Sequence, residues 1–233
     1  MSQLRLGDIK QYLNKITHAD CLEVLKELPD KSVDLVLTDF PYNEVNRDSN
    51  GLRPLDFGVA DKFELPFEDL MRELIRVCKG SFYAFCGIEQ VSDIRKYLVK
   101  SGFSTRLLIW EKTNPLPMNG EDIWLSGIEC CVYGKLKGAT FNEHCKNTVL
   151  RYPICADKFR FHKTQKPLVM FKYLVEVSSN KGDIVLDPFS GSGTTAIACH
   201  DLGRNFICIE KDEEYYKQSV ERLDNVRCQL KLF

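Results

Sequence analysis

The sequence predicts an α/β fold in which helices flank a twisted, mostly parallel sheet. Three apolar runs carry the prediction, and each precedes a helical pattern: residues 33–38, 184–186 and 205–209. Strands that alternate with helices form βαβ units, which make neighbouring strands parallel. The three runs end on Asp39, Asp187 and Glu210. Parallel sheets bind ligands at the carboxyl ends of their strands, so we expect these carboxylates at a ligand site.

Further segments continue the alternation. Shorter strands are expected at residues 80–86, 104–110 and 129–133, and helices at residues 21–28, 67–78, 91–101, 168–178, 194–202 and 213–225. The 233 residues, 44% of them hydrophobic, suffice for one globular domain that spans residues 1–233. Two stretches fit no regular element: residues 43–61 are polar, and residues 135–162 are basic and irregular. Loops this long inside a compact domain are usually functional or disordered.

Charge is distributed unevenly along the chain. The formal net charge is −1, yet residues 134–172 hold nine Lys or Arg against two acids, a local charge of +7 that leaves −8 on the rest. Such a basic segment is typical of a protein that holds nucleic acid on one face, although a solvated loop explains it equally well.

Neither the apolar runs nor the cysteines indicate a membrane or an oxidising compartment. No apolar run approaches the ~20 residues of a membrane span, and residues 1–10 lack the apolar core of a signal peptide. We therefore expect a cytoplasmic protein with no membrane partner. Its ten cysteines are expected to be reduced thiols rather than disulfides or metal ligands.

A glycine-rich turn, Asp187-Pro188-Phe189-Ser190-Gly191-Ser192-Gly193-Thr194-Thr195, joins a strand to a helix. Its two glycines allow a tight turn and close approach to a ligand, and the N–H groups that open the helix favour an anionic group. The turn lacks the lysine of a P-loop, but the spacing of its glycines is also compatible with a nicotinamide dinucleotide as the cofactor. Glu210, 23 residues after Asp187, is suited to accept ribose hydroxyls.

The tetrapeptide Asp39-Phe40-Pro41-Tyr42 follows the strand at residues 33–38. Pro41 keeps Phe40 extended, so that the Phe40 carbonyl and the Asp39 carboxylate can face one pocket beside the Tyr42 ring. Two acceptors suit the two N–H donors of an exocyclic amino group on a nucleobase and would hold its nitrogen toward a methyl donor. The aromatic ring would stack on the base. Taken in isolation, the tetrapeptide also fits an ordinary strand-ending turn.

Together, these motifs resemble the DNA amino-methyltransferases. The catalytic motif of that family is Asp/Asn/Ser-Pro-Pro-Tyr/Phe/Trp, and its cofactor motif is Asp-Pro-Phe-x-Gly-x-Gly-Thr-Thr. The catalytic motif comes first here, which is the permuted order of the beta class. Residues 19–34, 110–115 and 162–167 resemble further parts of the family, so the resemblance spans nearly the whole chain. It implies a Rossmann-like methyltransferase fold with S-adenosyl-L-methionine as cofactor.

The resemblance also implies a role for each motif residue. Asp39, Phe40, Pro41 and Tyr42 form the catalytic tetrapeptide that holds and stacks the target base. The implied cofactor site comprises Asp20 near the donor's adenine, Thr164 and Lys166 at its carboxylate end, Phe189, Gly191, Ser192, Gly193 and Thr194 around its methionine part, Glu210 at its ribose, and Asp187 at the head of the turn. Asp20, followed by Glu23, also fits a helix cap, and the two roles are compatible.

Two positions depart from the family pattern. Phe40 replaces the first proline of the catalytic motif, which predicts a less rigid turn and looser placement of the base. Lys163 replaces a proline in the donor motif and adds positive charge near the cofactor's carboxylate. Neither change removes a group that the chemistry needs.

Double-stranded DNA is the expected partner, with N6 of a flipped-out adenine as the target. We expect the basic stretch 135–162 to contact phosphates, and the loops 43–61 (with Arg47 and Arg53) and 112–122 to read bases.

Several alternatives stay open at this point. Asp39 favours adenine because family members that methylate cytosine N4 more often carry serine at that position. Cytosine N4 remains the main alternative, followed by a non-catalytic DNA-binding module and a nicotinamide-dependent oxidoreductase. A homodimer and a cognate restriction endonuclease are further partners that the sequence leaves open.

Overall fold

A computed structural model describes residues 9–41, 66–116, 124–154 and 165–229. The elements are, in chain order, β1 (Lys15–His18), α2 (Cys21–Glu27), β2 (Val33–Asp39), α3 (Phe67–Val77), β3 (Cys78–Cys86), η2 (Ile88–Gln90), α4 (Val91–Lys100), β4 (Ser104–Lys112), β5 (Ile128–Lys135), β6 (Val149–Tyr152), α5 (Leu168–Ser178), β7 (Ile184–Asp187), α6 (Thr194–Leu202), β8 (Asn205–Glu210) and α7 (Glu213–Gln229).

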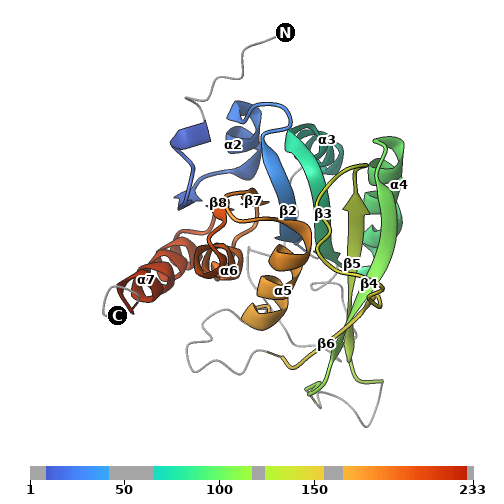
Figure 1. Ribbon diagram of the computed structural model, residues 1–233. Coiled ribbons are helices and arrows are strands. Elements are labelled where there is room, and N and C mark those ends of the chain that lie inside the picture. Colours follow the sequence, from blue (N-terminus) through green and yellow to red (C-terminus); the bar gives the residue numbers. More distant parts are fainter. Residues whose placement is uncertain (1–8, 42–65, 117–123, 155–164, 230–233) are drawn as a thin grey trace.

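The strands form one eight-stranded sheet in the order β1-β8-β7-β2-β3-β5-β4-β6 (Figure 1). Neighbouring strands run parallel except at β5, which is antiparallel to both β3 and β4. The other strands therefore all end at one edge of the sheet, which we call the carboxyl edge. Because β5 runs the opposite way, it begins at the carboxyl edge and ends at the far edge.

Helices cover both faces of the sheet and give a three-layer arrangement (Figure 1). On one face, α2, α3 and α4 bury Leu25, Leu74 and Ile94 in one apolar cluster. On the other face, α5 and α6 bury Leu174 and Ile197 in a second cluster, with α7 beside them. The central strand β2 contributes side chains to both clusters, which explains why its sequence is continuously apolar rather than alternating.

The mostly parallel sheet is confirmed, and every predicted strand and helix is present. Two short strands, β1 and β6, lie outside the predicted elements. β6 falls within residues 135–162, so the prediction of an irregular stretch there is wrong over Val149–Tyr152. Pairing with β4 and burial of Leu150 stabilise β6, and four residues are too few to show a periodic pattern. Among the described helices, none is long and apolar enough to cross a membrane.

Candidate active site

Three carboxylates lie at the carboxyl edge, at the ends of three adjacent strands. Glu210 ends β8, Asp187 ends β7 and Asp39 ends β2. The sheet thus brings the catalytic tetrapeptide next to the glycine-rich turn. A direct contact joins the two motifs, because the ring of Phe40 packs on the ring of Phe189 with their centroids 5.6 Å apart.

The glycine-rich turn depends on its glycines for both conformation and space. Gly191 and Gly193 have φ angles of 49° and 74°, in the left-handed region that favours glycine. A Cβ on Gly193 would lie 3.2 Å from side-chain atoms of both Ile16 and Ser219. The N–H of Ser190 donates to the carbonyl of Ile209 at 2.8 Å, which ties the turn to β8. The start of α6 is therefore presented at the carboxyl edge in a fixed orientation.

Asp187 stabilises this turn through hydrogen bonds. Its buried carboxylate accepts hydrogen bonds from the Thr195 hydroxyl at 2.5 Å and from the Phe189 N–H at 3.2 Å. Burial raises the pKa of Asp187 to about 7, although these hydrogen bonds act in the opposite direction. The two hydrogen bonds give Asp187 a structural role in shaping the turn.

Glu210 lies at the opening of the same turn. Its Oε2 accepts the Gly191 N–H at 2.7 Å, and its Oε1 accepts the Asp212 N–H at 2.9 Å. Burial raises the pKa of Glu210, while the two backbone N–H groups lower it. A carboxylate has about four lone-pair sites, so these bonds fix its orientation and still permit it to accept hydroxyl groups of a ligand.

Asp20 caps α2, as the sequence predicts: its carboxylate accepts the Leu22 N–H at 2.9 Å. Its other oxygen lies 3.2 Å from the Nζ of Lys211, the residue that follows Glu210. This ion pair links Asp20 to the end of β8. Asp20 therefore lies at the carboxyl edge, as the glycine-rich turn does.

Arg222 on α7 also supports the turn, and no motif in the sequence predicts this role. Its Nη1 donates to the carbonyl of Ser192 at 2.9 Å and to the Thr194 hydroxyl at 3.3 Å. The hydroxyls of Ser192 and Thr194 also lie 3.0 Å apart. An arginine on an amphipathic surface helix carries no signal in sequence that it reaches a loop 30 residues away.

Phe40 is held firmly, contrary to the looser turn that its replacement of proline predicts. Its side chain is 1% exposed, and its ring also packs on Phe67, at a centroid distance of 6.4 Å. Its N–H donates to the carbonyl of Phe85 at 2.9 Å. The following carbonyl, of Pro41, accepts the Nε2 of Gln90 at 3.0 Å. The tetrapeptide is thus fixed up to Pro41, and both Tyr42 and Thr164 lie outside the described residues.

Asp39 and Lys166 are in direct contact. The Nζ of Lys166 lies 2.5 Å from Oδ2 of Asp39 and 3.1 Å from Oε2 of Glu129. Oε1 of Glu129 lies 2.9 Å from the Nζ of Lys112. Glu129 is not among the site residues predicted from the sequence, and Lys112 was predicted only as the start of the base-reading segment 112–122. One available signal was an acid placed at the start of the otherwise apolar strand β5.

Comparison with known proteins identifies the family. A family model described as "DNA methylase" matches residues 118–221. The type II methyltransferase M.HinfI of Haemophilus influenzae is 30% identical over 256 residues, which cover 94% of this chain and 71% of that protein. The chain belongs to the DNA methylase family. This methyltransferase is also similar to the crystal structure of the M1.HpyAVI–SAM complex, with 30% identity, a TM-score of 0.71, and coverage of 90% of this chain and 99% of that one.

The fold is shared more widely within this class of enzyme. PvuII DNA methyltransferase, described as cytosine-N4-specific, superposes with a TM-score of 0.71 over 91% of this chain and 90% of that one, at 16% identity. That identity supports the Rossmann-like methyltransferase fold alone. The fold therefore does not distinguish between methylation of adenine N6 and of cytosine N4.

S-adenosyl-L-methionine is the methyl donor of this methyltransferase. The glycine-rich turn fits such a ligand in its chemistry. Gly191 and Gly193 leave no side chain over the start of α6, whose N–H groups attract a carboxylate. The oriented carboxylate of Glu210 suits hydroxyl donors such as those of a ribose. The donor supplies the methyl group, and these residues would hold and orient it.

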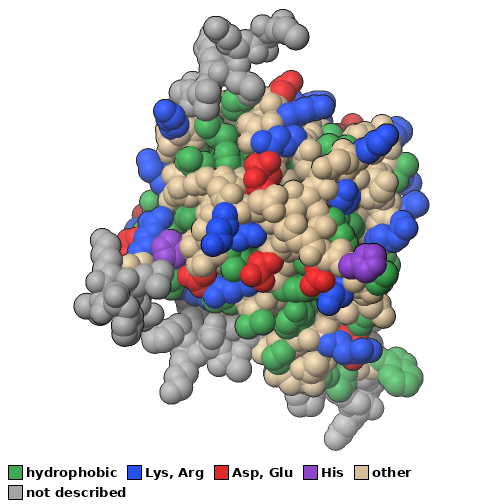
Figure 2. All heavy atoms as spheres, in the orientation of Figure 1, with side chains coloured by type: hydrophobic (Ala, Val, Ile, Leu, Met, Phe, Trp, Pro, Cys, Tyr) green, Lys and Arg blue, Asp and Glu red, His purple; other side chains and the backbone are tan. Residues whose placement is uncertain are grey.

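Several cations of the basic segment 134–172 are paired with acids. Of its six described Lys or Arg, four form ion pairs: Lys146 with Glu143, Arg151 with Glu111, Lys166 with Asp39 and Glu129, and Lys172 with Asp201. Figure 2 accordingly shows a face on which basic and acidic side chains are interspersed. Lys135 ends β5 and so lies at the far edge of the sheet, away from Asp39. Within the described part of residues 135–162, β6 leads back toward the carboxyl edge.

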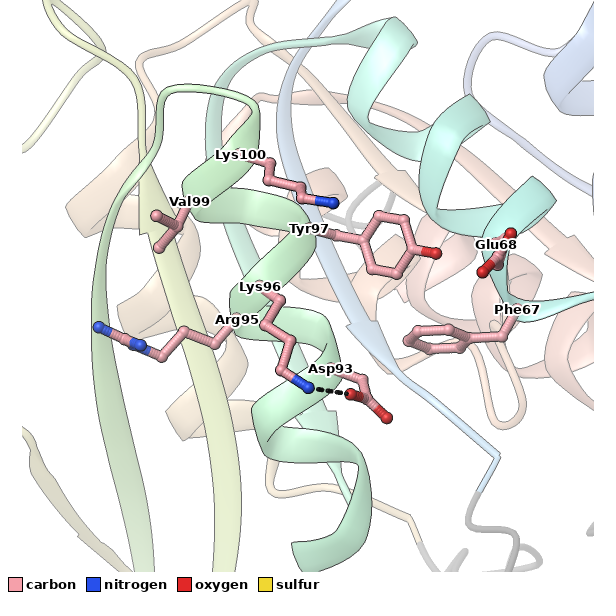
Figure 3. A pocket seen from close by; sticks show the side chains of 8 residues that line it. All are labelled: Phe67, Glu68, Asp93, Arg95, Lys96, Tyr97, Val99 and Lys100. Atoms are coloured by element: carbon pink, nitrogen blue, oxygen red, sulfur yellow. Dashed lines mark hydrogen bonds and ion pairs between the residues drawn. The ribbon is translucent and has the colours of Figure 1, made fainter.

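A surface pocket of about 540 Å³ lies between α3 and α4 (Figure 3). Phe67 and Tyr97 form its apolar wall, and Asp93 and Lys96 form an ion pair of 3.1 Å at its rim. Among the described residues, none from the two motifs lines it. One wall residue, Phe67, also packs on Phe40 of the tetrapeptide.

Proposed function

We propose that this methyltransferase transfers the methyl group of S-adenosyl-L-methionine to N6 of an adenine that is flipped out of double-stranded DNA at a specific sequence. The observation that carries the proposal is the position of Asp39, which ends β2 beside the strand that leads into the glycine-rich turn. A carboxylate in this position can hold an amino group next to the donor.

The chemistry requires that the target nitrogen be oriented and its lone pair made available. The Asp39 carboxylate and the Phe40 carbonyl are the two acceptors that we assign to the two N–H groups of the target. Binding both hydrogens favours a more pyramidal nitrogen whose lone pair faces the methyl group. Tyr42 is assigned to stack on the base, at roughly 1–3 kcal/mol by analogy with proteins that bind single strands. Asp39 also favours adenine over cytosine, because serine is more frequent here in cytosine-N4 enzymes.

We assign the donor site to the carboxyl edge as well. Phe189, Gly191, Ser192, Gly193 and Thr194 hold the methionine part, with Asp187 shaping the turn. Glu210 binds the ribose, Asp20 lies near the adenine of the donor, and Thr164 binds the carboxylate end. The contact between Lys166 and Asp39 favours a different role for Lys166 from the one expected at the donor's carboxylate.

We also propose that residues 1–233 form one catalytic domain that acts on duplex DNA. Extruding a base costs a few kcal/mol, which stacking and phosphate contacts offset. Loops 43–61 and 112–122 remain our candidates for base readout, together with the part of 135–162 that returns to the carboxyl edge. M.HinfI is a type II methyltransferase, and this likeness supports a protective role beside a cognate restriction endonuclease.

The decisive experiment identifies the methylated base. The purified protein is incubated with S-adenosyl-L-methionine and genomic DNA from a host that lacks DNA methylases, and the DNA is digested to nucleosides for mass spectrometry. We expect N6-methyldeoxyadenosine, and no product with Asp39→Ala, whose donor binding is retained by calorimetry. N4-methyldeoxycytidine instead would overturn the assignment of adenine. Full activity of Asp39→Ala would overturn the proposed chemistry for either base.

A further inference from the structure

A row of four alternating charges lies at the carboxyl edge beside the proposed target site. It runs from Lys112 through Glu129 and Lys166 to Asp39, with N···O distances of 2.9, 3.1 and 2.5 Å. Four elements contribute to it: the end of β4, the start of β5, the segment before α5 and the end of β2. The reversed direction of β5 is what brings Glu129 to this edge.

Lys166 is the most buried member of the row. Its side chain is 4% exposed, against 20% for Glu129 and 24% for Asp39. Burial alone would lower the pKa of Lys166, but the charges of Asp39 and Glu129 raise it above its usual value. Burial would likewise raise the pKa of Glu129, but Lys166 and Lys112 lower it. Lys166 and Glu129 therefore both favour their charged forms, and these two buried charges compensate one another.

We propose that Lys166, anchored by Glu129, is a positioning residue that holds the Asp39 carboxylate ionised and oriented for the target amino group. This inference rests on the proposed function and gives Lys166 a role on the side of the target base. Lys112 holds the other oxygen of Glu129 and so completes the anchor. The Phe85 ring, 5.7 Å from the Lys166 Nζ, adds a favourable cation–π contact.

The chemistry of the target explains why such a residue is useful. An ionised carboxylate is an acceptor only, whereas a protonated one would present a donor to an amino group that already carries two hydrogens. Lys166 contacts Oδ2, and a carboxylate with about four lone-pair sites can accept an N–H from the base as well.

Three other titratable groups in the described part of the chain face Asp39, and none of them is a cation. Asp187 on β7 is a carboxyl group, and the thiols of Cys86 on β3 and Cys131 on β5 have raised pKa values because they are buried. Neither kind of group supplies a positive charge. Among the described residues, Lys166 places a positive charge in contact with Asp39, and this charge favours the ionised form of the carboxyl group.

The row predicts the direction in which the acid limb of the pH–rate profile moves when Lys166 is replaced. A purely structural role of Lys166 predicts no such movement. Lys166→Met leaves Asp39 beside Glu129, two carboxylates without the cation between them. Like charges disfavour ionisation, so the acid limb of the pH–rate profile moves up by roughly one to three pH units. Adding Glu129→Gln removes the second carboxylate and moves the limb back down. Glu129→Gln alone keeps Lys166 on Asp39, so its limb stays at or below that of the wild type.

The experiment measures single-turnover transfer of tritiated methyl from S-adenosyl-L-methionine to unmethylated genomic DNA over a range of pH. Lys166→Met is expected to slow transfer about 100-fold near neutral pH, the scale of a misplaced reacting group. The dissociation constant for the donor, measured by calorimetry, stays within about threefold, which also reports that the variant is folded. Lys172→Met removes a lysine that pairs with Asp201 on α6 at 2.6 Å and serves as the matched control, with an unchanged profile.

Two results would overturn the inference. One is an unmoved acid limb in Lys166→Met with donor affinity reduced more than about tenfold, which would return Lys166 to the donor's carboxylate. The other is a double variant whose limb stays as high as that of Lys166→Met. If Lys166→Met does not fold, Glu129→Gln alone still tests the inference. An acid limb at higher pH than that of the wild type would then contradict the proposed electrostatic effect. The assay counts tritium transfer to either base. A methylcytosine product would therefore contradict the proposed methylation of adenine, but it would not affect this test of Lys166.

Discussion

The backbone N–H of Phe40 donates a 2.9 Å hydrogen bond to the carbonyl of Phe85. A proline at position 40, as the family motif has, could not make this bond. The rings of Phe67 and Phe189 enclose the Phe40 side chain, so one residue ties the tetrapeptide to α3 and to the glycine-rich turn. Rigidity that proline gives through its ring is obtained here through packing and a hydrogen bond.

Restoring the family's proline is therefore expected to harm this protein. Phe40→Pro loses both the N–H and a buried aromatic ring, so we expect the free energy of unfolding to fall by about 3–5 kcal/mol. Urea denaturation followed by circular dichroism measures the change. Phe40→Leu, which keeps the N–H and part of the volume, is the control and should lose less. A proline variant as stable as the wild type would show that neither contact matters.

The buried Asp187 makes stability depend on pH in a particular direction. Its pKa is raised from 3.8 to about 7 in the folded protein. Between these values the unfolded chain is ionised while the folded protein holds the proton, so this group's contribution is complete below about pH 4 and is lost as the pH rises to about 7. Asp187→Asn lacks this pH-dependent contribution to stability, because an amide does not titrate in this range. Relative to wild type, its stability should increase over this window by up to about 1.4 kcal/mol per pH unit, measured by urea denaturation. A constant difference between the two proteins would contradict the raised pKa.

Arg222 should affect donor binding from outside the motifs. Arg222→Met removes the donor to the Ser192 carbonyl and to the Thr194 hydroxyl, so the turn loses a fixed conformation. We expect affinity for S-adenosyl-L-methionine to fall about tenfold, the equivalent of one charged hydrogen bond, as measured by calorimetry. Lys217→Met on the same helix removes an exposed pair with Glu213 and should bind the donor normally. Equal affinities in the two variants would mean that Arg222 does not support the turn.

The direction of β5 predicts which basic residues do not contact DNA. Lys137 is exposed and follows the end of β5 at the far edge of the sheet. We expect Lys137→Glu to leave DNA affinity and its dependence on salt concentration unchanged in a fluorescence anisotropy titration. A phosphate contact would instead reduce the salt slope by about one, and that result would place DNA at the far edge as well.

The main features of the fold could be predicted because they repeat along the chain. Alternating strand and helix patterns located every major element, and carboxylates at strand ends indicated the ligand-binding edge. β1 and β6 could not be found this way, since neither forms a continuous apolar run and each depends on pairing with a strand distant in sequence. The direction of β5 could not be predicted either, because nothing in residues 128–135 indicates that this strand runs antiparallel to its neighbours.

The candidate site was predictable where it consists of contiguous motifs. Asp39, Asp187 and Glu210 were identified because each ends an apolar strand. Glu129 and Arg222 were not, because their partners lie 37 and 30 residues away and single charged side chains carry no periodic signal. Lys166 was expected at the donor because residues 162–167 resemble a donor-binding segment of the family, whereas its contact with Asp39 spans 127 residues.

The glycine-rich turn rests on α7, which the ribosome makes after the turn. Ser219 packs against Gly193, and Arg222 binds the residues on either side of it. A nascent chain that has reached only β8 already contains all of the donor-binding motif but lacks the helix that fixes its shape. We therefore expect the methyl donor to bind fully only once residues 213–229 have emerged and docked, so that the cofactor would be acquired late in the maturation of the enzyme.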